Sequence, residues 1–131
     1  MGTSGLAETV LLVDDDPDVR ALLGEVLRIG GFAILEAPDG TTALRIAETT
    51  LRPIELLVTD INMPGINGLE LARRVQALRP GTGVVYMSGA PADVVAAWSL
   101  ATGTVFLRKP FGADVFLDCV RDVVRDVMRR V

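Results

Sequence analysis

The sequence contains no histidine and almost no cysteine. The missing histidine excludes His-based catalytic triads, histidine metal ligands and a phosphohistidine formed on this chain. Any reaction that passes through phosphohistidine therefore has to take that group from another protein. Cys119 is the only cysteine, so no disulfide can form within the chain. The start, MGTSGLAE, has neither a basic flank nor an apolar core, so no secretory signal is indicated and the reducing cytoplasm is the expected location.

Lysine and long apolar segments are scarce as well. All 13 basic residues are arginine except Lys109, so a compact ammonium group at this one position calls for a reason. The formal net charge is −4, which argues against direct nucleic-acid binding because such domains normally present a basic face. Charged or turn-forming residues interrupt every apolar run before membrane-spanning length, so no membrane segment is predicted.

What the sequence does have is the material for one globular domain. Half of its 131 residues are hydrophobic and 23% are charged, which is enough for one hydrophobic core and too little chain for two ordinary ones. We expect residues 1–7 to be a flexible leader and residues 8–131 to be the domain.

Short apolar runs alternate with helical patterns along the chain. Strands are predicted over residues 10–13, 32–37, 54–59, 84–87 and 104–107. Helices are predicted from Asp16-Pro17 to Gly30-Gly31 and over 41–48, 71–78, 92–100 and 113–130, with Leu71, Val75 and Leu78 on the inner face of the third. This alternation predicts an α/β fold in which helices cover both faces of a parallel sheet.

Polar residues follow four of the five predicted strands. Asp14 and Asp15 follow the first strand, Asp60 the third, Ser88 the fourth and Lys109 the fifth. The carboxyl ends of parallel strands lie on one edge, so these side chains should converge there. Clustered carboxylates need a counter-charge, which a hard cation such as Mg²⁺ supplies, and a lysine suits a phosphoryl oxygen. Each residue alone has a simpler explanation, such as an acidic helix start or a turn hydroxyl, and only the set indicates a site.

Four segments carry a resemblance to a known family. VLLVDDDPDVR, LLVTDINMPGINGLEL, VVYMSG and VFLRKPF, in this order and spacing, resemble the receiver domain of two-component response regulators. The resemblance covers residues 8 to 131, and the last two segments look most like receivers attached to hybrid sensor histidine kinases. It implies a flavodoxin-like, three-layer (βα)5 fold with strand order 2-1-3-4-5.

The resemblance also implies a role for individual residues at the sheet edge. Asp60 falls on the phosphoacceptor and Asp15 on the direct Mg²⁺ ligand, with Mn²⁺ as an alternative ion. Asp14 falls on the acid that acts through metal-bound water, and Asn62 on the residue whose backbone carbonyl completes the metal site. Lys109 falls on the phosphate-binding lysine.

Three further positions match residues of the family that respond to phosphorylation or flank the lysine. Ser88 falls on the switch hydroxyl, and Pro110 on a proline that often follows a cis peptide bond. Phe106 falls on the rotating aromatic residue, which is frequently tyrosine in the family. Because Phe106 lacks the hydroxyl, plain core packing remains an alternative role for it.

The resemblance implies a phosphoacceptor rather than a conventional turnover enzyme. The phosphoryl donor would be a sensor histidine kinase or a histidine phosphotransfer protein, and the receiver would assist its own phosphorylation and dephosphorylation. Its surface of fourth helix, fifth strand and fifth helix would then change and contact a downstream protein effector, as a monomer or a phosphorylation-dependent dimer. Since no effector domain follows, output is expected through protein contacts, unless the chain is part of a larger protein.

Two other functions compete with this prediction. Haloacid-dehalogenase-like phosphatases also use an Asp nucleophile, and Asp14-x-Asp16, Ser88 and Lys109 could imitate three of their motifs. Against them, Asp18 stands where that family prefers a small hydroxyl or apolar residue, no late acidic pair is present, and Asp60 would have no role. The second alternative is a pseudo-receiver that never becomes phosphorylated, although none of the acids or the lysine is missing.

Overall fold

The structure is a computed structural model that describes residues 7–89 and 105–130. The predicted helix over residues 92–100 and all but the last residue of the predicted leader lie outside the described residues. Within the described ranges, every other predicted strand and helix is present, with bounds that differ by a few residues.

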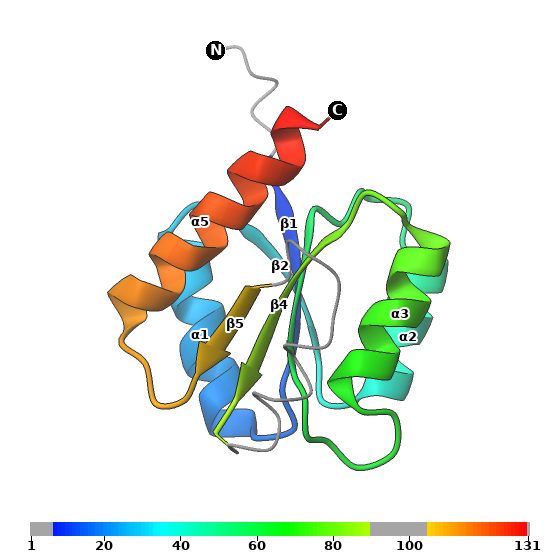
Figure 1. Cartoon of the computed structure of the whole chain (residues 1–131), viewed down its shortest axis with the longest axis horizontal. Helices are drawn as coiled ribbons and strands as arrows, with labels where there is room; N and C mark the ends of the chain where they lie inside the picture. Colours follow the sequence, from blue (N-terminus) through cyan, green and yellow to red (C-terminus); the bar gives the residue numbers. More distant parts are fainter. Residues whose placement is uncertain (1–6, 90–104, 131) are drawn as a thin grey trace.

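Five parallel strands form a single sheet in the order β2-β1-β3-β4-β5. The strands are β1 (Thr9–Val13), β2 (Ala33–Ala37), β3 (Leu56–Asp60), β4 (Gly83–Ser88) and β5 (Val105–Arg108). The described helices are α1 (Pro17–Ile29), α2 (Gly40–Thr49), α3 (Gly68–Leu78) and α5 (Ala113–Arg129). Helices α1 and α5 cover one face of the sheet, and α2 and α3 cover the other (Figure 1). The predicted α/β fold and strand order are therefore confirmed.

Two hydrophobic clusters, one on each face, hold the layers together. Neighbouring residues of a strand point to opposite faces, so Leu11 and Val13 join the cluster that includes residues of α2 and α3. Val10 and Leu12 join the other cluster, which includes Phe116 of α5. This double burial explains why β1 reads as a continuous apolar run rather than an alternating one.

Short polar side chains start three of the helices at the carboxyl edge of the sheet. The Asp16 carboxylate accepts hydrogen bonds from the backbone N–H groups of Asp18 and Val19, and Pro17 follows as the first helical residue, as predicted. Asp39 caps α2 and Asn67 caps α3 in the same manner. These caps fix where the chain leaves the edge that carries the predicted site.

The structure corrects several predicted details. Asp60 and Ser88 are the last residues of β3 and β4 rather than residues that follow them, and β3 begins at Leu56 instead of residue 54. Leu78, predicted on the inner face of its helix, is 48% exposed. It is the last residue of α3, where the helix ends.

Candidate functional site

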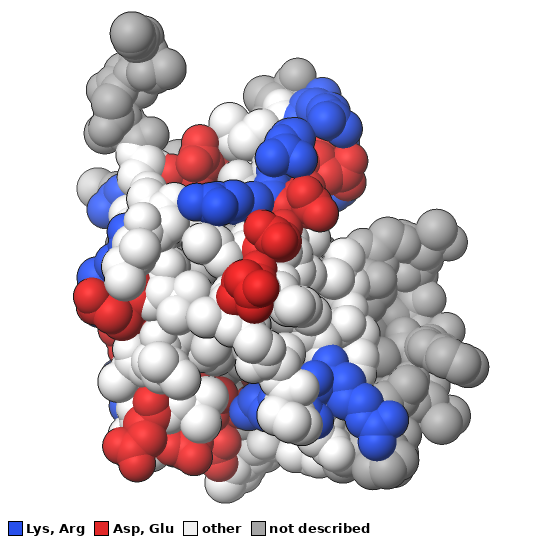
Figure 2. All heavy atoms as spheres, turned by 90° about the vertical axis from the view of Figure 1, so that its left-hand side faces the viewer, with Lys and Arg blue, Asp and Glu red and all other residues white. Residues whose placement is uncertain are grey.

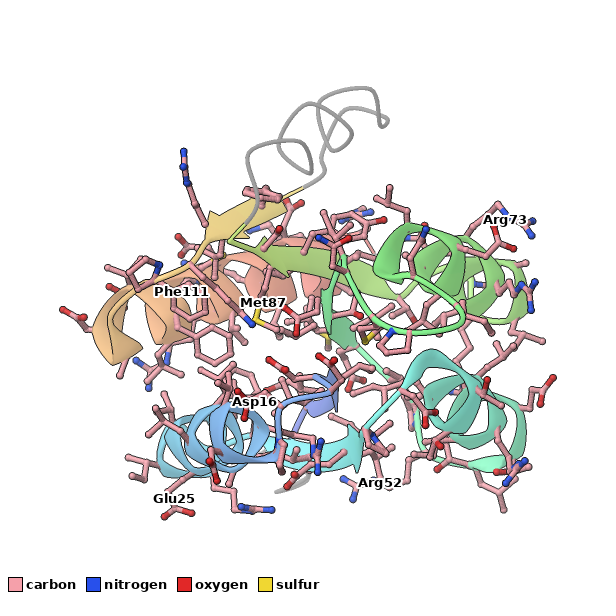
Figure 3. All side chains as sticks on the ribbon, turned by 90° about the horizontal axis from the view of Figure 1, so that it is seen from below. Asp16, Glu25, Arg52, Arg73, Met87 and Phe111 are labelled. Carbon is pink, nitrogen blue, oxygen red and sulfur yellow. The ribbon has the colours of Figure 1, made fainter. Side chains whose placement is uncertain are left out.

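Charged side chains from three strands meet at the carboxyl edge. The Lys109 ammonium, just past β5, lies 2.8 Å from Oδ1 of Asp60 and 3.2 Å from Oδ2 of Asp14. Asp14 is fully buried and Asp60 nearly so. Figure 3 shows this edge from below. Asp16 marks the loop after β1, Met87 marks β4, and Phe111 marks the loop after β5. The structure thus brings together three of the side chains expected there.

Asp14 is held by polar contacts on all sides. Its backbone N–H donates to the carbonyl oxygen of Ala37 at 3.3 Å, and its Oδ1 accepts from the Asp16 N–H at 2.9 Å. Its other carboxylate oxygen receives Lys109, and its carbonyl oxygen accepts from the Arg20 guanidinium at 2.6 Å. A buried carboxylate needs such partners, because removal from water is costly for an unpaired charge.

Asp15 completes a group of three carboxylates. One oxygen each from Asp14, Asp15 and Asp60 lie within 4.8 Å of one another, and Asp15 is the exposed member. Oxygen donors of this kind suit a hard divalent cation such as Mg²⁺, whereas zinc sites normally use histidine or cysteine. The donor set therefore fits the ion that the sequence resemblance implies. Asn62 lies exposed in the loop that follows β3.

The electrostatics of the site favour the arrival of a cation. Burial and the neighbouring Asp14 carboxyl raise the pKa of Asp60 to about 7, and Lys109 offsets this only in part. Burial alone would lower the pKa of Lys109, but the carboxylates of Asp60 and Asp14 raise it above its ordinary value. Lys109 therefore stays charged, but the ionised form of Asp60 remains unfavourable until further positive charge arrives.

Gly68 brings the start of α3 against the end of β3. A Cβ at this residue would overlap the carbonyl oxygen of Asp60, and the Gly68 N–H donates to the carbonyl of Ile61 at 2.8 Å. Gly65 in the same loop has a φ of +78°, which favours glycine. Sequence reasoning assigned no role to Gly68, since the close approach depends on how α3 docks.

Ser88 lies on β4, next to the strand that carries Asp60, and Phe106 lies on β5, the edge strand beyond it. Ser88 is buried at the end of β4, and its carbonyl accepts the backbone N–H of Lys109 at 2.9 Å. Phe106 is half-buried, pairs in register with Tyr86 and packs against the cluster on the α2 and α3 side. The Lys109–Pro110 peptide bond is cis, as the resemblance implied.

A parallel sheet in the order β2-β1-β3-β4-β5, with acids and a lysine at its carboxyl edge, places the chain among the flavodoxin-like α/β proteins, which bind their ligands at the strand ends. Within that class, the chain belongs to the response regulator receiver domain family, whose model matches residues 10–121. It is accordingly a receiver domain of two-component signal transduction. This membership argues against the haloacid-dehalogenase alternative.

Individual relatives agree with the family. The chain is similar to the transcriptional regulatory protein PrrA of Mycobacterium tuberculosis, with 38% identity over 112 residues, covering 85% of this chain and 47% of that protein. It is similar to the C4-dicarboxylate transport transcriptional regulatory protein DctD of Rhizobium meliloti, with 32% identity over 116 residues, covering 88% and 25%. The chain thus spans between about a quarter and about half of the length of these curated relatives.

Solved structures agree as well. The receiver domain of the hybrid histidine kinase CckA is 33% identical with a TM-score of 0.76, and the match covers 88% of this chain and 98% of that one. A receiver domain from Clostridium thermocellum has a TM-score of 0.85 over 95% of this chain and 99% of that one, and its 23% identity supports the fold alone. In the described part of the chain, no helix has the length and apolar character needed to cross a membrane.

Proposed function

We propose that this receiver accepts a phosphoryl group on Asp60 from the phosphohistidine of a sensor histidine kinase or a histidine phosphotransfer protein. The observation that carries the proposal is the Lys109 ammonium, which contacts Asp60 and Asp14 at the edge where Asp15 completes the carboxylate group. The donor histidine has to lie outside these 131 residues, because they contain no histidine.

The transfer requires little more than position and charge. A carboxylate oxygen of Asp60 forms the new O–P bond while the N–P bond of the donor breaks, and the imidazole nitrogen keeps the electron pair of that bond. Lys109, at 2.8 Å from Asp60, neutralises charge on the transferring group. Water later hydrolyses the acyl phosphate and regenerates the carboxylate.

The acids at this edge would hold Mg²⁺, with Mn²⁺ as a chemically similar substitute. Asp15 and Asp60 would be direct ligands together with the backbone carbonyl of Asn62, and Asp14 would act through water. The bound ion supplies positive charge to the phosphoryl oxygens. Without it, Lys109 is the only cation paired with the side chains of Asp14 and Asp60 in the described residues.

The output is a change of surface for protein contacts. Ser88 would follow the phosphoryl oxygen inward, and Phe106 would turn toward the space that Ser88 leaves. The affected surface includes β5 and α5, as well as the predicted helix that lies outside the described residues. Figure 2 shows acidic and basic side chains interspersed on the side of the molecule that carries α1 and α5, where Asp122 pairs with Arg125 at 3.2 Å.

Such a surface suits a protein effector rather than nucleic acid, in a cytoplasmic receiver spanning residues 8–131. It would act as a monomer or as a phosphorylation-dependent dimer. The assembly is open to a light-scattering measurement with and without a phosphoryl mimic.

The first test is the intact mass of the protein after incubation with acetyl phosphate and Mg²⁺. We expect one phosphoryl adduct, lost in Asp60→Asn and in EDTA, and kept in Asp18→Asn, which removes an exposed acid from the first turn of α1. No adduct on a protein that binds Mg²⁺ would support the pseudo-receiver. Steady hydrolysis of a phosphomonoester that survives Asp60→Asn but not Asp14→Asn would support the phosphatase alternative.

A further inference from the structure

Arg20 on α1 connects the acidic edge to an ion-pair group that the proposed function does not use. Its Nη1 donates to the backbone carbonyl of Asp14 at 2.6 Å, and its Nε lies 3.7 Å from Oε1 of Glu36 on β2. The other carboxylate oxygen of Glu36 accepts from Arg28 at 3.0 Å. Glu36 therefore binds two arginines of α1, and only one of them reaches the site.

The packing of α1 leaves room for this arrangement at a glycine. Gly24 lies in the middle of α1, where glycine is less favourable than alanine. A Cβ at Gly24 would lie 3.2 Å from Oε2 of Glu36, which is a tight contact. The glycine thus allows the Glu36 carboxylate to lie against the helix between Arg20 and Arg28.

The carbonyl that Arg20 binds belongs to the peptide unit that carries Asp15. A peptide unit is planar, so fixing the Asp14 carbonyl also fixes the direction of the Asp15 backbone N–H and Cα. The preceding peptide unit is held by another hydrogen bond, because the Asp14 N–H donates to the carbonyl oxygen of Ala37. The Asp15 side chain is exposed, so its position depends on the backbone that carries it.

We propose that Arg20, oriented by Glu36, is a positioning residue for the cation site, because it holds the Asp14–Asp15 peptide so that Asp15 faces Asp60. The inference rests on the proposed function, which requires a cation at Asp15 and Asp60. The inference also predicts the direction in which the Mg²⁺ affinity changes when Arg20 is removed. Loss of a nearby positive charge would by itself strengthen Mg²⁺ binding, whereas loss of a positioning contact weakens it.

The test is the Mg²⁺ dissociation constant of the whole chain, measured by calorimetry at low salt. For Arg20→Ala we expect affinity about tenfold weaker than wild type, the lower end of the range for residues that orient metal ligands. Arg28→Ala is the matched control, because it removes an equal charge from the same carboxylate but makes no contact with Asp14. Its Mg²⁺ affinity should stay within about twofold of wild type. Glu25, the other partner of Arg28, points away from the molecule (Figure 3).

Two further variants distinguish the positioning effect of Arg20 from the effect of its charge and from a general loss of local structure. Arg20→Lys keeps the charge, but an ammonium lacks the separate nitrogens that contact the Asp14 carbonyl and Glu36. Its Mg²⁺ affinity should therefore lie between those of Arg20→Ala and wild type. Glu36→Gln keeps Arg20 and should weaken binding less than Arg20→Ala does. Backbone amide exchange at Asp14, whose N–H donates to Ala37, should accelerate in Arg20→Ala and not in Arg28→Ala.

Equal or tighter Mg²⁺ binding by a folded Arg20→Ala overturns the inference and leaves the proposed function intact. Equal weakening in Arg20→Ala and Arg28→Ala also overturns it, because the effect would then come from the ion-pair group as a whole. Absence of Mg²⁺ binding by the wild type would instead contradict the proposed function, and with it the site that Arg20 is inferred to position.

Discussion

The two edges of the sheet use basic side chains in opposite ways. At the amino edge, Arg79 donates to three backbone carbonyls, those of Ala47 at 2.9 Å, Thr50 at 2.6 Å and Arg52 at 2.9 Å. At the carboxyl edge, Lys109 faces buried carboxylates instead. The amino edge therefore joins one cation to neutral acceptors rather than to acids.

This difference indicates that the amino edge contributes to stability, whereas the carboxyl edge keeps acids that a ligand can neutralise. Hydrogen bonds from a guanidinium to carbonyls satisfy polar groups at little electrostatic cost. Buried acids that outnumber their cation destabilise the ionised form, as the raised pKa of Asp60 indicates. Substitutions at the two edges should consequently separate stability from phosphorylation.

The largest effect on activity is expected for Lys109→Met. It removes the positive charge 2.8 Å from Asp60, so phosphorylation by acetyl phosphate should slow by about 100- to 1000-fold. The rate of adduct formation by mass spectrometry measures this. Arg108→Met, which removes the exposed neighbouring cation, should change the rate by less than about threefold. Equal rates in the two variants would contradict the role of Lys109.

Gly68→Ala tests whether the close approach at the carboxyl edge is required. The new Cβ meets the backbone of Asp60 and Ile61, neither of which can move aside as a flexible side chain could, so we expect a loss of about 3 kcal/mol. The free energy of unfolding in urea measures it. Gly81→Ala is the control, because a Cβ there contacts nothing within 4 Å. Similar costs at both sites would show that α3 can shift.

Arg79→Ala should destabilise without affecting the chemistry. Three carbonyls lose a charged donor, which we expect to cost about 2 kcal/mol of unfolding free energy in urea, with the phosphorylation rate within about twofold of wild type. Arg74→Ala, which removes only an exposed ion pair with Glu70, should cost less than about 0.5 kcal/mol. A large change in phosphorylation rate would contradict the separation of the two edges.

The smallest effect is a pH-dependent gain in stability from Asp60→Asn in EDTA. Asp60 has a raised pKa, so the folded wild type holds the proton more tightly than the unfolded chain does. Its stability therefore falls as pH rises from about 4 through about 7, while the asparagine variant escapes this loss. We expect the variant to be more stable by about 1–2 kcal/mol at pH 8 and by nearly nothing at pH 4.

Thermal unfolding at the two pH values measures the difference. Asp18→Asn serves as the exposed control and should show no such pH dependence. A gain of equal size at both pH values would contradict repulsion at the carboxyl edge as its cause.

Much of the fold could be predicted from local patterns. The apolar runs and helical spacing predicted the alternating elements, and Asp16-Pro17 predicted the start of α1, because caps and turns depend on residues close in the chain. The acids and Lys109 could be assigned to one edge, since parallel strands end together. Their individual roles came from the family resemblance. Leu78 was predicted inside and is exposed, because helical spacing alone does not show how far burial continues toward the end of a helix.

The sequence by itself therefore determined the α/β architecture and the edge on which the charged residues gather. Only the tertiary structure decided that Lys109 contacts both Asp14 and Asp60, that Arg20 reaches the Asp14 carbonyl, and that α3 lies against Asp60 at Gly68. The reason is physical. Periodicity and turn chemistry act over a few residues, whereas these contacts depend on how separately formed helices and strands dock, and a shift of an ångström would remove them.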